Sequence, residues 1–183
     1  MKRLPLIILV SAFCAATVAA QKAESVYTDL EAKTCKTIEF EHEGYSSTQE
    51  CPGVAGYKLH VLEGDERQSI TVVKPDGSKH PLDFWSTVSP AFSSVGQKAE
   101  WRVRARRGRV EPFALVVRYN ARENPDNFEA FTSYLVVARI APGRVCVTDK
   151  IAPGPRANEL ARAAADASAT KPCLPAIGEG DAQ

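Results

Sequence analysis

Residues 100–151 predict the central part of the fold, because they contain four runs with strand patterns: EWRVRARRGR (100–109), PFALVVRY (112–119), TSYLVVARI (132–140) and RVCVTD (144–149). In the first run apolar residues alternate with arginines, which is the period of a strand with one buried face. The second and third runs are apolar at most positions, as in central strands that are covered on both faces. Turn residues separate the runs, so we predict a four-stranded antiparallel meander on which the other elements pack.

Outside the meander, alternating or β-branched residues indicate further strands at 26–30, 34–41, 57–62, 69–74 and 80–84. The pattern favours an α+β fold. We expect a predominantly antiparallel β-sheet of about seven or eight strands, curved or folded over, with one C-terminal helix packed on it. The stretch 85–98 is rich in serine, and we predict an ordered loop there, anchored by Trp85 and Phe92.

The predicted helix covers residues 159–168, with Asn158 as its N-cap. Its side chains, mostly small, form one smooth face that can lie close to the sheet: Leu160, Ala161, Ala164 and Ala165. Residues 175–183 lack an apolar pattern, so we predict a flexible tail there. A single disulfide-bonded domain is therefore expected at 21–174, which is long enough to bury a hydrophobic core.

Residues 1–20 have the pattern of a cleaved secretory signal peptide. Two basic residues precede an apolar run at 4–16, and small residues follow up to Ala20, after which we expect cleavage. Cys14 raises the alternative of a lipoprotein, but the large side chain of Phe13 disfavours that processing. No later run is apolar enough to span a membrane, so we expect a periplasmic or secreted protein.

The charge of the chain argues against one class of function. The sequence has 23 basic and 22 acidic residues, and without the two basic residues of the signal segment the balance is 23 − 2 = 21 against 22, a net charge of −1. A dedicated nucleic-acid-binding protein is usually strongly basic. We therefore expect no dedicated nucleic-acid binding.

The cysteines after the signal segment number four, and an even number in an exported chain indicates disulfides. A three-residue hairpin loop at 42–44, with its glycine in the left-handed conformation, places Cys35 opposite Cys51. Cys146 and Cys173 then form the second pair, which ties the helix to the last strand. The alternation along residues 35–41 conflicts with the Cys35–Cys51 pair, because it places Glu39 and Glu41 on the same strand face as Cys35. A β-bulge would resolve this conflict.

The densest charge in the chain is a set of five arginines within eight residues: Arg102, Arg104, Arg106, Arg107 and Arg109. Alternation places three of them on one sheet face, and arginine can hold phosphate, sulfate or carboxylate in bidentate fashion. These arginines are therefore candidates for binding a ligand, with Trp85 as a further, aromatic contact. The near-neutral total charge favours the other interpretation, a solvated strand whose arginines pair across to acidic residues such as Glu111.

Signals for catalysis are weak. The chain has no Gly-x-Ser-x-Gly, Walker-type or Gly-x-Gly-x-x-Gly pattern, so we assign no catalytic residue and expect no nucleotide cofactor. His42, His60 and His80 are dispersed and there is no Cys-x-x-Cys, so we predict no metal site.

Three segments carry a resemblance: CPGVAGYKLHVLEGDERQSITV (51–72), VGQKAEWR (95–102) and ANELAR (157–162). Together they resemble small uncharacterised exported proteins of Gram-negative bacteria, over most of the mature chain. The resemblance implies residence in the periplasm and no particular activity.

These observations favour a non-catalytic binding or interaction module of the cell envelope, with an envelope protein or an anionic polymer as its partner. One alternative is a small periplasmic hydrolase with a site between the sheet and the 85–98 stretch. Another is a structural envelope component. A deep pocket that holds a histidine and a carboxylate would favour the enzyme, whereas a flat arginine face without a pocket would favour binding.

Overall fold

Ten strands in the described part of the chain pair into two antiparallel sheets. The structure is a computed structural model, and it describes residues 22–42 and 44–178. Sheet A has the strand order β1 (Glu24–Asp29), β7 (Ser93–Arg106), β8 (Arg109–Ala121), β9 (Thr132–Ile140) and β10 (Val145–Ile151). Sheet B has the strand order β2 (Lys36–Glu41), β3 (Ser46–Pro52), β4 (Lys58–Gly64), β5 (Arg67–Val73) and β6 (Lys79–Pro81).

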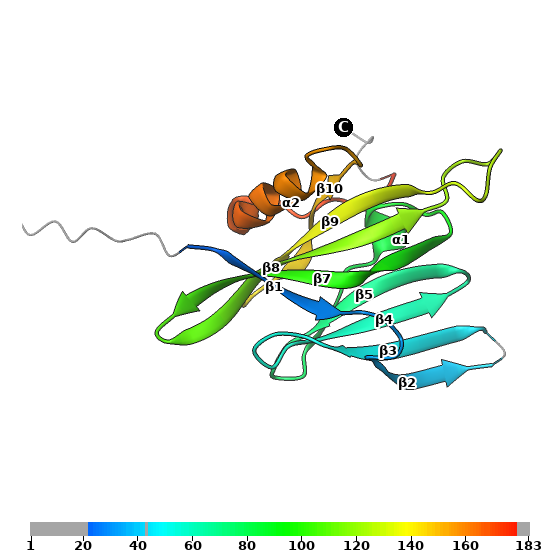
Figure 1. Ribbon diagram of the computed structural model, residues 1–183. Coiled ribbons are helices and arrows are strands. Elements are labelled where there is room, and N and C mark those ends of the chain that lie inside the picture. Colours follow the sequence, from blue (N-terminus) through cyan, green and yellow to red (C-terminus); the bar gives the residue numbers. More distant parts are fainter. Residues whose placement is uncertain (1–21, 43, 179–183) are drawn as a thin grey trace, which may run out of the picture.

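The two sheets pack face to face, and helix α2 (Ala157–Asp166) covers the outer face of sheet A (Figure 1). The core between the sheets contains large, fully buried side chains from both of them, among them Leu59, Ile70, Trp101, Leu115 and Tyr119. A smaller apolar cluster lies between α2 and sheet A. The predominantly antiparallel β fold with a C-terminal helix is confirmed, but the strands are more numerous than we expected and form two sheets instead of a single curved or folded one.

The predicted meander is confirmed, because β7, β8, β9 and β10 are neighbours in that order. Strand β8 is covered on both faces, as its apolar sequence indicates. Leu115 and Val117 face the core between the sheets, whereas Ala114 and Val116 belong to the cluster beneath α2. Strand β1 pairs with the other side of β7, so β7 is an internal strand as well.

The segment 85–98 contains more regular structure than the predicted loop. The short helix α1 (Phe84–Thr87) begins it, and β7 already starts at Ser93. The pairing of β7 with β8 shifts register between Val95 and Ala99. Residues around such a bulge do not follow a simple alternation, so an argument from period alone cannot recognise this part of the strand.

The predicted disulfide between Cys35 and Cys51 is confirmed, and a β-bulge in the same strand pair resolves the conflict with the glutamate pattern. The register of β2 on β3 shifts between Thr37 and Glu39. Beyond the shift, Glu39 accepts a hydrogen bond from the Thr48 hydroxyl on the outer face of sheet B. The glutamates therefore face outward, while Cys51 packs into the core between the sheets.

The loop of this hairpin is longer than predicted, because β2 ends at Glu41 and β3 begins only at Ser46. Tyr45 has a positive φ of 47°. We predicted the left-handed conformation for Gly44. The φ angle of Gly44 depends on the position of Glu43, which lies outside the described residues, so this prediction is untested.

Helix α2 begins earlier than predicted. Its N-cap is Arg156, which provides no side-chain cap, so the prediction of Asn158 as the cap was wrong. The predicted buried face is confirmed for Ala161, Ala164 and Ala165. Leu160 is 48% exposed and does not belong to that face. The helix therefore contacts the sheet almost entirely through alanines, which allows a close approach.

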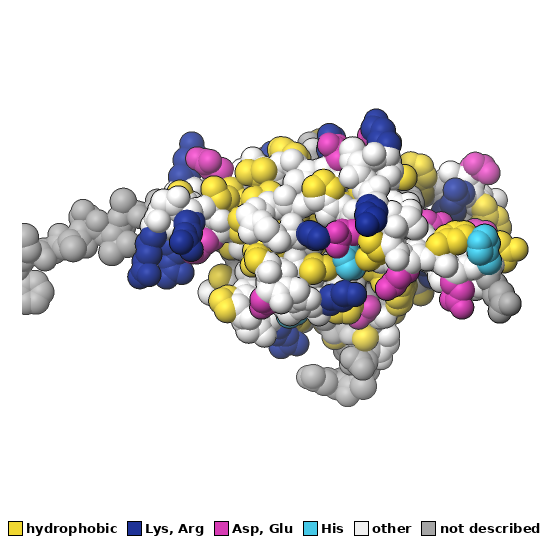
Figure 2. All heavy atoms as spheres, turned by 90° about the horizontal axis from the view of Figure 1, so that it is seen from below, with side chains coloured by type: hydrophobic (Ala, Val, Ile, Leu, Met, Phe, Trp, Pro, Cys, Tyr) yellow, Lys and Arg dark blue, Asp and Glu magenta, His cyan; other side chains and the backbone are white. Residues whose placement is uncertain are grey.

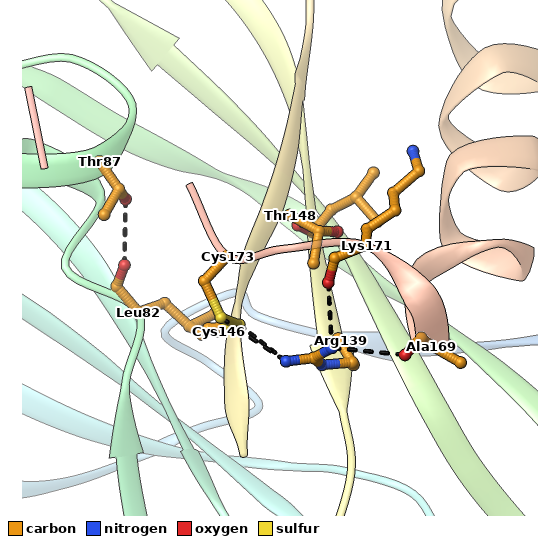
Figure 3. The surroundings of a disulfide bond; sticks show 9 residues. Leu82, Thr87, Arg139, Cys146, Thr148, Ala169, Lys171 and Cys173 are labelled. Atoms are coloured by element: carbon orange, nitrogen blue, oxygen red, sulfur yellow. Dashed lines mark hydrogen bonds between the residues drawn. A yellow bond between two sulfur atoms is a disulfide. The ribbon is translucent and has the colours of Figure 1, made fainter. Parts of the chain in front are cut away.

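The second predicted disulfide, between Cys146 and Cys173, is also confirmed (Figure 3). The Arg139 guanidinium lies beside the two sulfur atoms and donates hydrogen bonds to the carbonyl oxygens of Ala169 and Lys171. These bonds hold the segment after α2 against β9 and β10.

The chain after this disulfide makes further backbone contacts. Leu174 N donates to Val147 O, and Ile177 N donates to Ser86 O at 2.7 Å. The tail that we predicted from residue 175 is therefore in contact with α1 at its start. Residues 179–183 and the predicted signal peptide at 1–20 lie outside the described residues.

Candidate functional site

Four of the predicted arginines lie at the tip of the β7–β8 hairpin, which projects beyond the body of sheet A (Figure 1). Arg106 pairs with Arg109 across a two-residue turn whose residues both have positive φ, 50° at Arg107 and 74° at Gly108. Two positive φ values are typical of a type I′ turn, which suits the right-handed twist of paired strands. All residues from 105 to 111 are exposed. We call residues 104–111 the arginine hairpin.

Two side chains of the arginine hairpin have neighbours on the hairpin itself or just beyond it. The Arg104 guanidinium lies 3.9 Å from the centre of the Phe113 ring, a cation–π contact. Arg106 approaches Glu111 at 3.7 Å, and these side chains are 66% and 50% exposed. An ion pair with this much exposure contributes only about 0–1 kcal/mol. The predicted cross-strand pairing with Glu111 is thus present, but it does not cover the arginine.

Arg107 and Arg109 have no ionic or hydrogen-bonding side-chain partner within the described residues. Arg107 and Arg109 adjoin Gly108, at the two-residue turn that ends the hairpin. Figure 2 shows dark blue side chains gathered at the end of the molecule where this hairpin projects. The tip therefore presents guanidinium groups that are available to an external anion.

Arg102 shares the sheet face of Arg104 and Arg106, as predicted, but it is not exposed with them. Its exposed fraction is only 7%. It donates two hydrogen bonds of 2.8 Å to the carboxylate of Asp166 on α2, and a third to the Ser25 hydroxyl. Because its hydrogen-bonding groups are occupied inside the protein, Arg102 holds the helix on the sheet.

A second ion pair lies beside Arg102 on the same face. Arg162 of α2 donates to Glu100 at 2.7 Å and also to the hydroxyl of Tyr27 on β1. Burial raises the pKa of Glu100, but the hydrogen bonds from Arg162 and Ser25 outweigh it and hold this pKa below its ordinary value. Sequence patterns do not reveal this network, because its members come from three separate segments.

Trp85 belongs to α1, which lies at the end of the molecule opposite to the arginine hairpin (Figure 1). There it lines a hollow. The hollow has a volume of about 390 Å³, and side chains of β2, β3 and β4 form most of it. The structure therefore does not bring Trp85 together with the arginines as one binding site.

Phe92, the other predicted anchor, lies beneath the guanidinium of Arg67, which is 5.1 Å from the centre of its ring. It also lines a smaller hollow of about 290 Å³, together with Arg122 and the exposed Phe131. The residues that line this hollow include acidic, basic and aromatic side chains, so no single sign of charge predominates.

One polar cluster lies where the alternative hydrolase site was predicted, between sheet A and the 85–98 segment. Tyr134 donates to the Glu123 carboxylate at 2.6 Å, and Lys150 lies 3.9 Å from the centre of the Tyr134 ring. Lys150 also donates to Val88 O at 2.7 Å. Burial, followed by the hydrogen bond to Glu123, raises the pKa of Tyr134 to about 12. No local sequence motif indicates this cluster, and its groups are paired with one another, as in a structural contact.

The three histidines are separated by the fold as they are in the sequence. His60 is buried and lies 3.3 Å from a Glu50 oxygen on the neighbouring strand, and His80 lies near Ser78. Within the described residues, no group of three or more His, Cys, Asp and Glu side chains is placed to hold a metal ion. In the same part of the chain, none of the helices has the length and hydropathy needed to cross a membrane.

The chain shows no significant match to any family model, curated protein or solved structure. The resemblance to exported Gram-negative proteins therefore stays a prediction, and functional inference depends on the geometry of this chain.

Proposed function

We propose that this protein is an exported, non-catalytic binding module of the cell envelope whose arginine hairpin engages an anionic ligand. The observation that carries the proposal is the composition of the projecting tip, whose residues 104–111 include four arginines and one acidic residue, Glu111. Like charges concentrated on one exposed turn raise the local potential even when the net charge of the molecule is close to zero. The two disulfides support export, because such bonds persist in oxidising compartments.

The chemistry of the hairpin suits carboxylate, phosphate or sulfate groups. A guanidinium group donates several hydrogen bonds in a planar fork that matches these anions. The type I′ turn restricts the backbone between Arg106 and Arg109, so binding need not order a flexible loop. Arg102 is excluded from the proposed contact set, because its partners lie inside the protein.

Retention on immobilised heparin, used as a probe polyanion, tests the proposal. The wild-type protein should be retained at low salt and elute as the ionic strength rises, because screening shortens the range of the attraction. The variant Arg107→Gln/Arg109→Gln should lose most of this retention. Both residues are exposed, so its melting temperature should be unchanged.

A matched control separates hairpin binding from an effect of net charge. Arg144→Gln/Arg156→Gln removes the same charge from two exposed positions outside the hairpin, and this variant should be retained like the wild type. If the wild type flows through at low salt, or if both double variants lose retention equally, the hairpin is not an anion-binding element.

A further inference from the structure

The hollow lined by Trp85 is formed mainly by residues that the register places on the outer face of sheet B. The register places Glu39 opposite Thr48 and Thr48 opposite Leu62, so these three side chains form a row across β2, β3 and β4. Adjacent residues of the same strands point to the opposite face, and of these Val61, for example, belongs to the core between the sheets. Trp85 of α1 closes one side of the row. The result is an open, concave site at the end of the molecule opposite to the arginine hairpin.

The lining of this hollow is chemically one-sided. Glu39 and Glu41 contribute carboxylates from the outer face, and no lysine or arginine is among the described lining residues. Glu63 also lines the hollow, but its side chain has the parity of the opposite face and accepts a hydrogen bond from Gln68. The carboxylates of Glu39 and Glu41 each accept one hydrogen bond from a neighbouring hydroxyl group, which leaves each of them acceptor capacity for an external donor.

The apolar part of the lining points to the same kind of ligand. Trp85 contributes aromatic surface beside the carboxylates, whereas Phe40, which also lines the hollow, has the parity of the opposite face of β2. An aromatic face beside carboxylates suits a guanidinium group in particular, because arginine combines bidentate hydrogen bonds to a carboxylate with stacking on a ring. A cluster of carboxylates without an aromatic side chain would not favour a guanidinium group over other cations.

We propose that the arginine hairpin of one copy docks in this hollow of a second copy. The inference rests on the proposed function, since it names the anionic ligand of the hairpin as the carboxylate-lined hollow of the same protein. The two surfaces are complementary in charge, and a narrow type I′ tip presents Arg107 and Arg109 to a concave site. Because hairpin and hollow lie at opposite ends of one molecule, a copy cannot fill its own hollow (Figure 1).

The geometry of this contact determines the kind of assembly. The two patches are different surfaces, so the contact is heterologous, and each copy retains one free hairpin or one free hollow. Such head-to-tail contacts produce open chains, or rings where the rotation between copies closes. The contact is small and rich in charge, so the assembly should be weak and should depend strongly on salt.

Sedimentation velocity of the purified protein tests the proposal. At low salt the weight-average mass should rise with protein concentration, and at about 1 M salt, where the Debye length is only about 3 Å, it should return to that of the monomer. A short heparin oligosaccharide that fits only one hairpin should also return it to the monomer, because it competes for the same arginines. A wild-type protein that stays monomeric at low salt and high concentration would overturn the proposal.

Complementary charge reversals locate the contact. Arg107→Glu/Arg109→Glu and Glu39→Lys/Glu41→Lys should each abolish self-association, because each places like charges across the contact. Mixing the two variants should restore it, since each then offers a hairpin that is opposite in charge to the other's hollow. All four positions are exposed, so unchanged melting temperatures verify that both variants are folded.

The two proposals fail in different ways. Heparin retention by a protein that remains monomeric would keep the anion-binding hairpin and overturn only the self-association. Self-association that persists in both charge-reversal variants, or that mixing does not restore, would show that copies meet through another surface. A wild type that neither associates nor is retained by heparin would overturn both.

Discussion

The Arg102 guanidinium and the Asp166 carboxylate are joined by two hydrogen bonds of 2.8 Å, which connect the middle of β7 to the end of α2. The arginine side chain is 8% exposed and the aspartate side chain 40%. Water therefore screens one partner but not the other. This pair distinguishes Arg102 from Arg104 and Arg106 of the arginine hairpin, although the three residues belong to one alternating run.

Replacing Arg102 by glutamine should lower the free energy of unfolding by about 1–3 kcal/mol, because it removes the charge that compensates Asp166. The loss should be below that of a fully buried pair, since Asp166 retains contact with water. Urea unfolding measures the effect. Arg106→Gln is the matched control on the same face and should change stability by no more than about 0.5 kcal/mol. Equal effects of the two substitutions would contradict the structural role of Arg102.

The alanine face of α2 gives a second prediction. Ala161→Asp should destabilise the protein by about 3 kcal/mol or more, because Ala161 is only 1% exposed and the new carboxylate would be buried without a partner. Ala163→Asp makes the same change at an exposed position of the same helix and should cost less than about 1 kcal/mol. Thermal unfolding of the two variants should therefore differ clearly, and similar melting temperatures would show that the helix does not pack as described.

The second disulfide should contribute a measurable part of the stability. Cys146 and Cys173 are separated by 27 positions. The entropy of closing such a loop in the unfolded chain corresponds to about 3.5 kcal/mol. Replacing both cysteines by serine should lower the free energy of unfolding by roughly that amount. A loss below about 1 kcal/mol would mean that the other contacts of this segment, such as those of Arg139, hold it without the covalent bond.

Tyr134 should titrate abnormally at high pH. Its pKa is raised from 10.0 to about 12, by burial first and then by the hydrogen bond to Glu123. A raised pKa means that the contribution of Tyr134 to stability is complete below pH 10 and is lost as the pH rises toward 12. The ultraviolet absorbance of tyrosinate, compared with that of Tyr134→Phe, isolates this group. A Tyr134 that ionises near pH 10 would contradict the hydrogen bond.

Glu100 should make the protein sensitive to acid. Its pKa is lowered below the ordinary value of 4.5, because hydrogen bonds from Arg162 and Ser25 outweigh the effect of burial. A lowered pKa means that the stabilisation is complete above about pH 4.5 and is lost as the pH falls through the pKa of the folded state. The variant Glu100→Gln should be less stable at neutral pH and should lose less stability between pH 5 and pH 3. An unchanged slope in that window would contradict the assignment.

Several features of the fold could be predicted from local patterns. The order of the meander follows from four apolar runs separated by turns, and both disulfides were predicted correctly. For Cys35 and Cys51 the prediction used loop arithmetic, and the loop is in fact longer by one residue. The bulge between Thr37 and Glu39 compensates for this difference, so the two cysteines still meet.

The candidate site could be predicted only in part. The arginine run and its alternation were evident in the sequence, as was the pairing with Glu111. The location of Trp85 was not, because nothing in its neighbourhood indicates that α1 packs at the end of sheet B where glutamates gather. The hollow itself is formed by three strands and one short helix, and no local motif encodes such a shape.

The strand pattern, the cysteine pairing, the alanine face of the helix and the turn at Arg107 and Gly108 can be predicted from local sequence, because each depends on period, spacing or the conformational range of a few neighbouring residues. The exposure of each arginine to water depends instead on the tertiary structure. Arg102 and Arg106 have the same place in the alternation, yet α2, which begins far along the chain, covers the first and ends short of the second. Burial is set by what packs from a distance, here by a partner 64 residues away, and a local period carries no information about it.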